Sequence, residues 1–219
     1  MNVVWRILGF QLLAQVGARL PARYARLVTV ALLVVSNLVP LVGAAMGWMS
    51  LGDVFAVYWL ENVIVWIFST IRIATAKGPT SPLASAAFFC FHYGIFTVVH
   101  GVFTIVMIAM TGSGFVHYRS WLIAGAALFV SHLLSLVIHW FGRGERLVTT
   151  PRQAMFWPYP RMLVLHVAII GSFFLLLRGL AEDGTADEVL PVFLLVGLKL
   201  TIDIVLHVRE RVRAAGGTV

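Results

Sequence analysis

The sequence predicts an all-α protein: a polytopic membrane bundle of about six transmembrane helices, preceded by an interfacial amphipathic helix. Of the 219 residues, 60% are hydrophobic and only 11% are charged, and the mean hydropathy is +0.94. Soluble domains contain roughly 45–50% apolar and about 25% charged residues. The composition therefore excludes a water-soluble globular domain, and it excludes intrinsic disorder, which needs low hydrophobicity. The long, continuous apolar runs favour helices over the short alternating segments of a membrane β-barrel.

Six apolar runs are long enough to cross a bilayer, which requires roughly 20 residues each. We place them at 26–48, 53–74, 83–110, 120–141, 161–180 and 188–208. Pro160 suits the first turn of the fifth helix, and Trp157, Tyr159 and Arg161 are expected to anchor its entry at the membrane interface. The predicted organisation is an interfacial helix at 1–23, a membrane domain at 24–210 and a cytoplasmic tail at 211–219.

The first 23 residues contain a polar face. Gln11, Gln15, Arg19 and Arg23 recur every four residues, a spacing that places them on one side of a helix. The apolar stretch after Arg6 could mimic a signal peptide, but it is short and Arg19 and Arg23 follow it, which disfavours translocation. We therefore expect this segment to lie in the membrane interface.

The basic residues set the expected orientation. The net charge is +7, and 13 of the 16 Lys and Arg residues fall on one side of the predicted spans. The positive-inside rule then places both termini in the cytoplasm of a bacterial cell, in the inner membrane. Because the positive charge lies between hydrophobic spans, it indicates contact with a lipid bilayer and no nucleic-acid partner.

Ionisable side chains inside the spans are the candidates for function, because each costs about 2.5–3.5 kcal/mol to insert at mid-helix. Six of the seven histidines lie in spans or at their ends. Imidazole and carboxylate are the ligand types of Zn and Fe, and helical bundles build metal sites from such groups on different helices. We predict a divalent metal centre, Zn or Fe, in the cytoplasmic half of the bundle. The predicted ligands are His92, His132, His166, Asp203, His207 and His100, with Asn62, Tyr93, Lys199 and Arg161 as supporting polar residues.

We estimate how deep each residue lies in the membrane by counting residues from the cytoplasmic end of its span, at about 1.5 Å per residue. His166 and Asp203 fall at roughly 7–8 Å, His92 and His132 at roughly 12–14 Å, and His100 near 24 Å. The estimate therefore groups His92, His132, His166 and Asp203 in one layer.

Several functions fit the same residues. In a metal-dependent membrane enzyme, Glu61 is the expected general base. In a proton-coupled transporter or ion channel, the residues form a relay. A b-type haem held by two histidines is a further alternative, as is a structural partner of another membrane complex or of a second copy of the chain. Local explanations also exist: Asp203 can pair with Lys199, and a protonated Glu61 can bond to Tyr93 or His100.

Five segments resemble the motif blocks of an uncharacterised family of bacterial and archaeal multi-pass membrane proteins, a domain of unknown function. The segments are YWLENV (58–63), FHYGIFTVVHGVF (91–103), SHLLS (131–135), PYPRMLVLH (158–166) and KLTIDIVLH (199–207). The resemblance spans roughly residues 26–208 and names no reaction. This chain has His139 and Trp140 where relatives carry an Asn-Tyr pair. The polar positions that the resemblance carries over are Glu61, Asn62, His92, His100, His132, Arg161, His166, Asp203 and His207.

Overall fold

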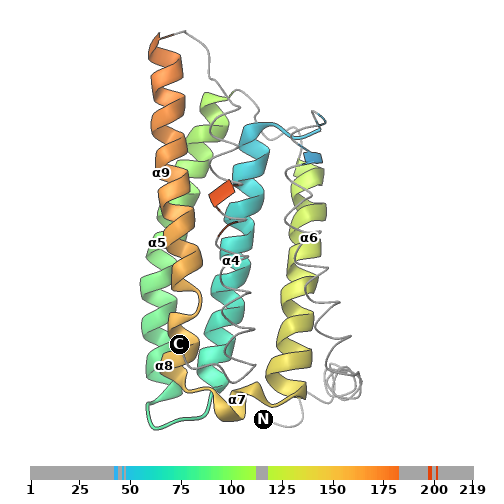
Figure 1. Cartoon of the computed structure of the whole chain (residues 1–219), viewed down its shortest axis with the longest axis vertical. Helices are drawn as coiled ribbons and strands as arrows, with labels where there is room; N and C mark the ends of the chain where they lie inside the picture. The colour runs from blue at the N-terminus through green and yellow to red at the C-terminus, as the bar shows by residue number, and fades with distance from the viewer. Residues whose placement is uncertain are drawn as a thin grey trace.

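The computed structural model is all-helical and has no strands in its described part, which comprises residues 42, 43, 46, 48–111, 118–182, 197, 198 and 201. The long helices are α4 (Leu51–Thr75), α5 (Pro82–Met110), α6 (Tyr118–Ser135) and α9 (Tyr159–Glu182). A π-helical segment, η1 (Leu136–Gly142), continues α6, and the short helices α7 (Glu145–Val148) and α8 (Pro151–Phe156) lead into α9. Helix α4 lies between α6 on one side and α5 with α9 on the other (Figure 1).

Four helical segments among these residues are long and apolar enough to cross a membrane: Gly52–Thr75, Pro82–Met110, Trp121–Gly142 and Pro151–Glu182. They correspond to the second to fifth predicted spans, and they fit the predicted multi-pass membrane protein. Apolar side chains on α5 such as Phe91, Val98 and Val102 face outwards, as contact with lipid requires. The predicted spans 26–48 and 188–208, the interfacial helix and the tail lie outside the described residues, apart from a few positions.

The helices begin where the sequence supplies caps. Ser50 and Asp53 form a reciprocal capping box at the start of α4, with the Ser50 N–H donating to Asp53 Oδ2 at 2.6 Å. Ser81 and Pro82 begin α5, and Thr150 with Gln153 caps α8. After η1, Gly144 adopts a φ of 73°, a left-handed conformation that glycine adopts without a steric penalty.

Helix α6 is joined to α4 at both ends. At one end, the indole N–H of Trp121 donates to Asp53 Oδ1 at 2.6 Å. At the other, Arg72 donates to Ser135 Oγ at 3.0 Å, and the indole of Trp140 donates to Thr75 Oγ1 at 2.8 Å. These polar bonds fix the register of the two helices along most of their length.

Helices α4 and α5 approach closely because glycines on α5 face tryptophans on α4. A Cβ added at Gly101 would lie 2.8 Å from Trp59 Nε1, and one added at Gly94 would lie 2.9 Å from Trp66 Cζ2. Both pairs are seven residues apart on their helices, so the same contact repeats after two turns. The indoles donate to main-chain carbonyls of α5, Trp59 to Thr97 and Trp66 to Cys90.

We predict that Gly101→Ala lowers the free energy of unfolding by about 1–3 kcal/mol, because the added methyl group overpacks against the Trp59 indole. Gly125→Ala is the matched control, since a Cβ there meets only Leu60 Cδ1 at an ordinary 3.5 Å. Replacing that helical glycine should leave stability unchanged or raise it. Reversible unfolding of the purified protein in bicelles measures both changes. Equal effects of the two substitutions would contradict the close approach.

Candidate functional site

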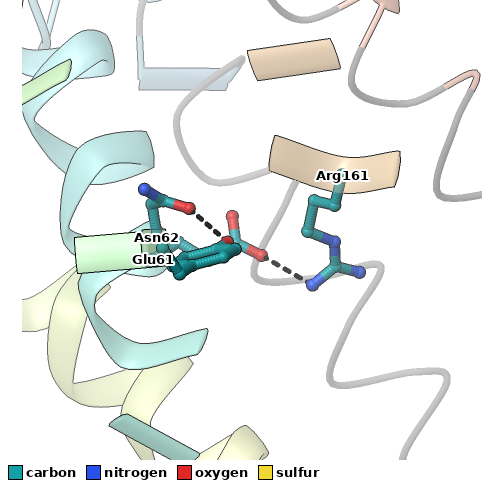
Figure 2. A network of polar contacts seen from close by, with 4 residues as sticks. Glu61, Asn62 and Arg161 are labelled. Atoms are coloured by element: carbon teal, nitrogen blue, oxygen red, sulfur yellow. Dashed lines mark hydrogen bonds and ion pairs between the residues drawn. The ribbon is translucent and has the colours of Figure 1, made fainter. Parts of the chain in front are cut away.

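A buried ion pair joins α4 to α9. Glu61 Oε1 lies 3.6 Å from Arg161 Nη1, with the Glu61 side chain only 2% exposed and that of Arg161 21% exposed. Figure 2 shows the carboxylate of Glu61 directed towards the guanidinium, with Asn62 beside it on the same helix. Each charge compensates the other in a region of low dielectric. The sequence predicts Arg161 both as an interfacial anchor of the helix and as a supporting polar residue of the site, and its contact with Glu61 is of the second kind.

Asn62 connects α4 to α5 through a fully buried chain of hydrogen bonds. The Tyr93 hydroxyl donates to Asn62 Oδ1 at 2.6 Å, and Asn62 Nδ2 donates to Thr97 Oγ1 at 3.1 Å. The Thr97 hydroxyl in turn donates to the carbonyl of Tyr93 at 3.0 Å. The alternative in which Tyr93 bonds to Glu61 is not the arrangement seen, because the Tyr93 hydroxyl points to the neighbouring amide.

Two histidines meet between α5 and α9. His100 Nε2 lies 2.8 Å from His166 Nδ1, so the N–H of one ring donates to a ring nitrogen of the other. His100 is completely buried, and its second nitrogen, Nδ1, has no hydrogen-bond partner among the described residues. His166 is half-buried. This is the closest approach of two predicted ligands that the described part of the chain contains.

The other two described histidines of the predicted ligand set lie elsewhere. His92 Nδ1 bonds to the Tyr159 hydroxyl at 2.9 Å, and its ring stacks on Phe88. His132 stacks on Phe68 of α4, on the side of α4 that faces α6. Within the described ranges, no three His, Cys, Asp or Glu side chains are grouped closely enough to hold a metal ion. Lys199, Asp203 and His207 lie outside the described residues, so their roles stay predictions.

The predicted depth of His166 is wrong. The estimate placed it about 16 Å from His100 along the membrane normal, whereas the two rings are hydrogen-bonded. The span begins at Pro151, ten residues before the predicted start at 161, because α8 and the turn at Trp157 and Pro158 belong to the same membrane-crossing segment. Because of these ten additional residues, His166 lies farther along its span than predicted, at the same height in the bundle as His100.

A pocket lies beside the ion pair. It is small, and it is lined by Tyr58, Glu61, Asn62, Arg161, Val164, Leu165 and Ala168. Its polar groups come from α4 and Arg161, and its apolar wall comes from α9. Leu165 is adjacent in sequence to His166, so the pocket and the histidine pair occupy neighbouring levels of the bundle.

Some partners of the site residues were not foreseen. The sequence predicts Tyr159 as an interfacial anchor, whereas its hydroxyl bonds to His92. Trp59 and Thr97 form an α4–α5 contact but lie outside the predicted set. The matched seven-residue spacing of Trp59 with Trp66 and of Gly94 with Gly101 is a sequence signal that could have indicated the α4–α5 contact.

We predict that Arg161→Met lowers the free energy of unfolding by about 3–5 kcal/mol, because it leaves the Glu61 charge buried without its counter-charge. The double variant Glu61→Gln/Arg161→Met should be more stable than Arg161→Met, since it removes both charges. Arg178→Met is the control, because Arg178 pairs with Glu182 on an exposed surface and its loss should change little. Unfolding in bicelles tests all three, and a double variant as unstable as Arg161→Met would contradict the ion pair's importance.

Comparisons with known proteins support the resemblance noted in the sequence. No curated protein matches the chain, and no solved structure matches it. A family of unknown function, DUF6498, matches residues 19–218, which is nearly the whole chain. The chain with this buried Glu61–Arg161 pair and His100–His166 pair therefore belongs to the family of unknown function DUF6498.

Proposed function

We propose that this integral membrane protein is metal-dependent, with a divalent ion held between α5 and α9 by His100 and His166. The supporting observation is the 2.8 Å separation of His100 Nε2 and His166 Nδ1 on two different helices. Two nitrogen ligands of a tetrahedral zinc ion lie roughly 3.3 Å apart, since each metal–nitrogen bond is about 2.0–2.1 Å. A small rotation of either ring therefore allows both nitrogens to bind one ion.

The remaining ligands are proposed to be Asp203 and His207. Their spacing of four residues would put them on one face of the helix that the sequence predicts at 188–208. His92 does not join this set, because eight residues separate it from His100 and the helical rise between them is about 12 Å. Nor does His132, which stacks against Phe68 of α4. The proposal thus retains four of the six ligands that the sequence predicts.

A bound Zn or Fe ion would supply Lewis acidity and activate a water molecule inside the bundle. Glu61 is the proposed general base. It lines the pocket next to the histidine pair, and Arg161 compensates the charge of its carboxylate. The pocket would then hold the substrate.

The metal content of the purified protein tests this proposal. We expect about one Zn or Fe ion per chain, lost in both His100→Ala and His166→Ala. His139→Ala is the matched control, since His139 lies in η1 and outside the proposed set; it should retain the ion. Elemental analysis after size-exclusion chromatography gives the measurement. Less than about 0.2 ion per chain in the unaltered protein would contradict the proposal.

A proton-coupled transporter is a second candidate, because two titratable rings are directly hydrogen-bonded in the middle of the bundle. Such a pair can pass a proton from one ring to the other. The protein in liposomes should then show flux driven by a pH gradient, and His100→Asn should abolish it. Flux that persists in His100→Asn, or no flux for any ion tested, would exclude this relay.

A b-type haem is less favoured by the geometry. Haem held by two histidines needs both rings on opposite faces of the macrocycle, whereas the directly bonded rings of His100 and His166 have no space between them. An absorption spectrum of the purified protein decides the matter, since bound haem gives a Soret band.

A further inference from the structure

Basic residues are concentrated in two chain segments at one end of the bundle. The segment 76–81 connects α4 to α5, and the segment 143–158 contains α7 and α8; both lie at the same end (Figure 1). Their charged residues are Lys77, Arg143, Arg146 and Arg152, with Glu145 as the single acid. The first turns of α5 and α8 also carry no acidic residue. Positive charge is therefore in excess at this end.

Two contacts hold the segments together. The main-chain N–H of Lys77 donates to the carbonyl of Arg146 at 3.0 Å. Gly78 packs on the start of α8, where an added Cβ would lie 2.8 Å from Pro151 Cδ. Lys77 and Arg152, the chain neighbours of Gly78 and Pro151, are both exposed. The fold thus gathers Lys77, Arg146 and Arg152, which we call the basic edge, from two segments far apart in the sequence.

The basic edge has no counter-charge in the described part of the chain, where none of its three residues forms an ion pair. The guanidinium carbon of Arg146 lies 5.5 Å from the centre of the Phe141 ring, and its buried Nε has no hydrogen-bond partner among the same residues. Like charges brought together repel each other, and a bound anion offsets this repulsion. The basic edge therefore suits an anionic ligand.

Large apolar side chains are exposed next to these cations. Val148 of α7 is 83% exposed, Leu83 at the start of α5 is 73% exposed, and Phe156 and Trp157 at the end of α8 are also exposed. Tryptophan and basic residues together are typical of the membrane–water interface. A soluble anion would leave the apolar side chains in water, whereas the chains of a lipid would cover them.

We propose that the basic edge binds the phosphate of an anionic lipid, whose hydrocarbon chains cover the exposed apolar side chains beside it. A zwitterionic headgroup brings its own cation, which would meet the positive charge of Lys77, Arg146 and Arg152. The excess of positive charge therefore selects a lipid with a net negative headgroup. This site is separate from the histidine pair, and the proposal does not depend on a bound metal.

Native mass spectrometry of the full chain, released from detergent micelles, measures this selectivity. The probes are phosphatidylglycerol and phosphatidylcholine with identical acyl chains. We expect the first phosphatidylglycerol to bind at least about tenfold more tightly, because each basic residue near an anionic headgroup contributes roughly a fivefold gain. Equal affinity for the two lipids would overturn the proposal.

Substitutions locate the site. Lys77→Gln/Arg152→Gln removes two exposed charges and should reduce the preference for phosphatidylglycerol to less than about threefold. Arg119→Gln/Arg178→Gln is the matched control, since it removes two exposed cations from the opposite end of the bundle; it should keep the preference.

The exchange Lys77→Arg/Arg152→Lys retains both charges and should bind phosphatidylglycerol as the unaltered protein does. An unchanged preference in Lys77→Gln/Arg152→Gln would contradict the basic edge as the site. So would an equal loss in the control variant or in the charge-retaining exchange.

Two anions without acyl chains distinguish a lipid from a soluble ligand. Inorganic phosphate and glycerol phosphate, added as ammonium salts, offer the same charge but cannot cover Val148 or Phe156. Both should bind at least about tenfold more weakly than phosphatidylglycerol, because they bury no apolar surface. Binding of either anion as tight as that of the lipid would assign the basic edge to a soluble ligand and overturn the proposal.

Discussion

The structure depends on one constraint: polar side chains inside an apolar bundle must find their partners on neighbouring helices, because lipid supplies none. Helix α4 shows this most clearly. Its Asp53 bonds to Trp121 of α6, its Asn62 to Tyr93 and Thr97 of α5, and its Glu61 pairs with Arg161 of α9. Each of these contacts fixes the position of one neighbouring helix along the axis of α4. The polar residues that make the sequence costly to insert therefore also determine how the helices are arranged.

Helix positions could be predicted from the sequence, because apolar runs and caps are local features. The predicted spans 53–74 and 83–110 differ from Leu51–Thr75 and Pro82–Met110 by at most two residues at any end. The span predicted at 161–180 starts ten residues too late. Pro158 and Pro160 interrupt the apolar run there, and hydropathy alone does not reveal that the short helix α8 continues into the membrane segment. The π-helical part of the fourth span likewise has no hydropathy signal.

The pairing of the site residues was harder to predict from the sequence, because it depends on the register between helices that are far apart in the chain. Helices α5 and α9 run in the same direction, with His92 beside Tyr159, His100 beside His166 and Phe103 beside Phe173. An error of ten residues in the start of one helix shifts every such pair by about 15 Å. The sequence therefore indicated which residues are buried and polar, including Glu61, Asn62 and His100, but its depth estimate placed His166 in a layer with His92 and His132 and not beside His100.

The π-helical segment η1 changes the direction of side chains at the end of the bundle that carries Arg72 and Arg146. A π turn contains about one residue more than an α turn, and one residue corresponds to about 100° around a helix. The side chains after Leu136 are therefore rotated relative to a continuous α-helix, and Trp140 lies fully buried, with its indole bonded to Thr75. Removal of a single residue from this stretch would turn that indole by about 100° away from Thr75 and break its bond to the last turn of α4. Chain length in this stretch is thus as strictly constrained as residue identity.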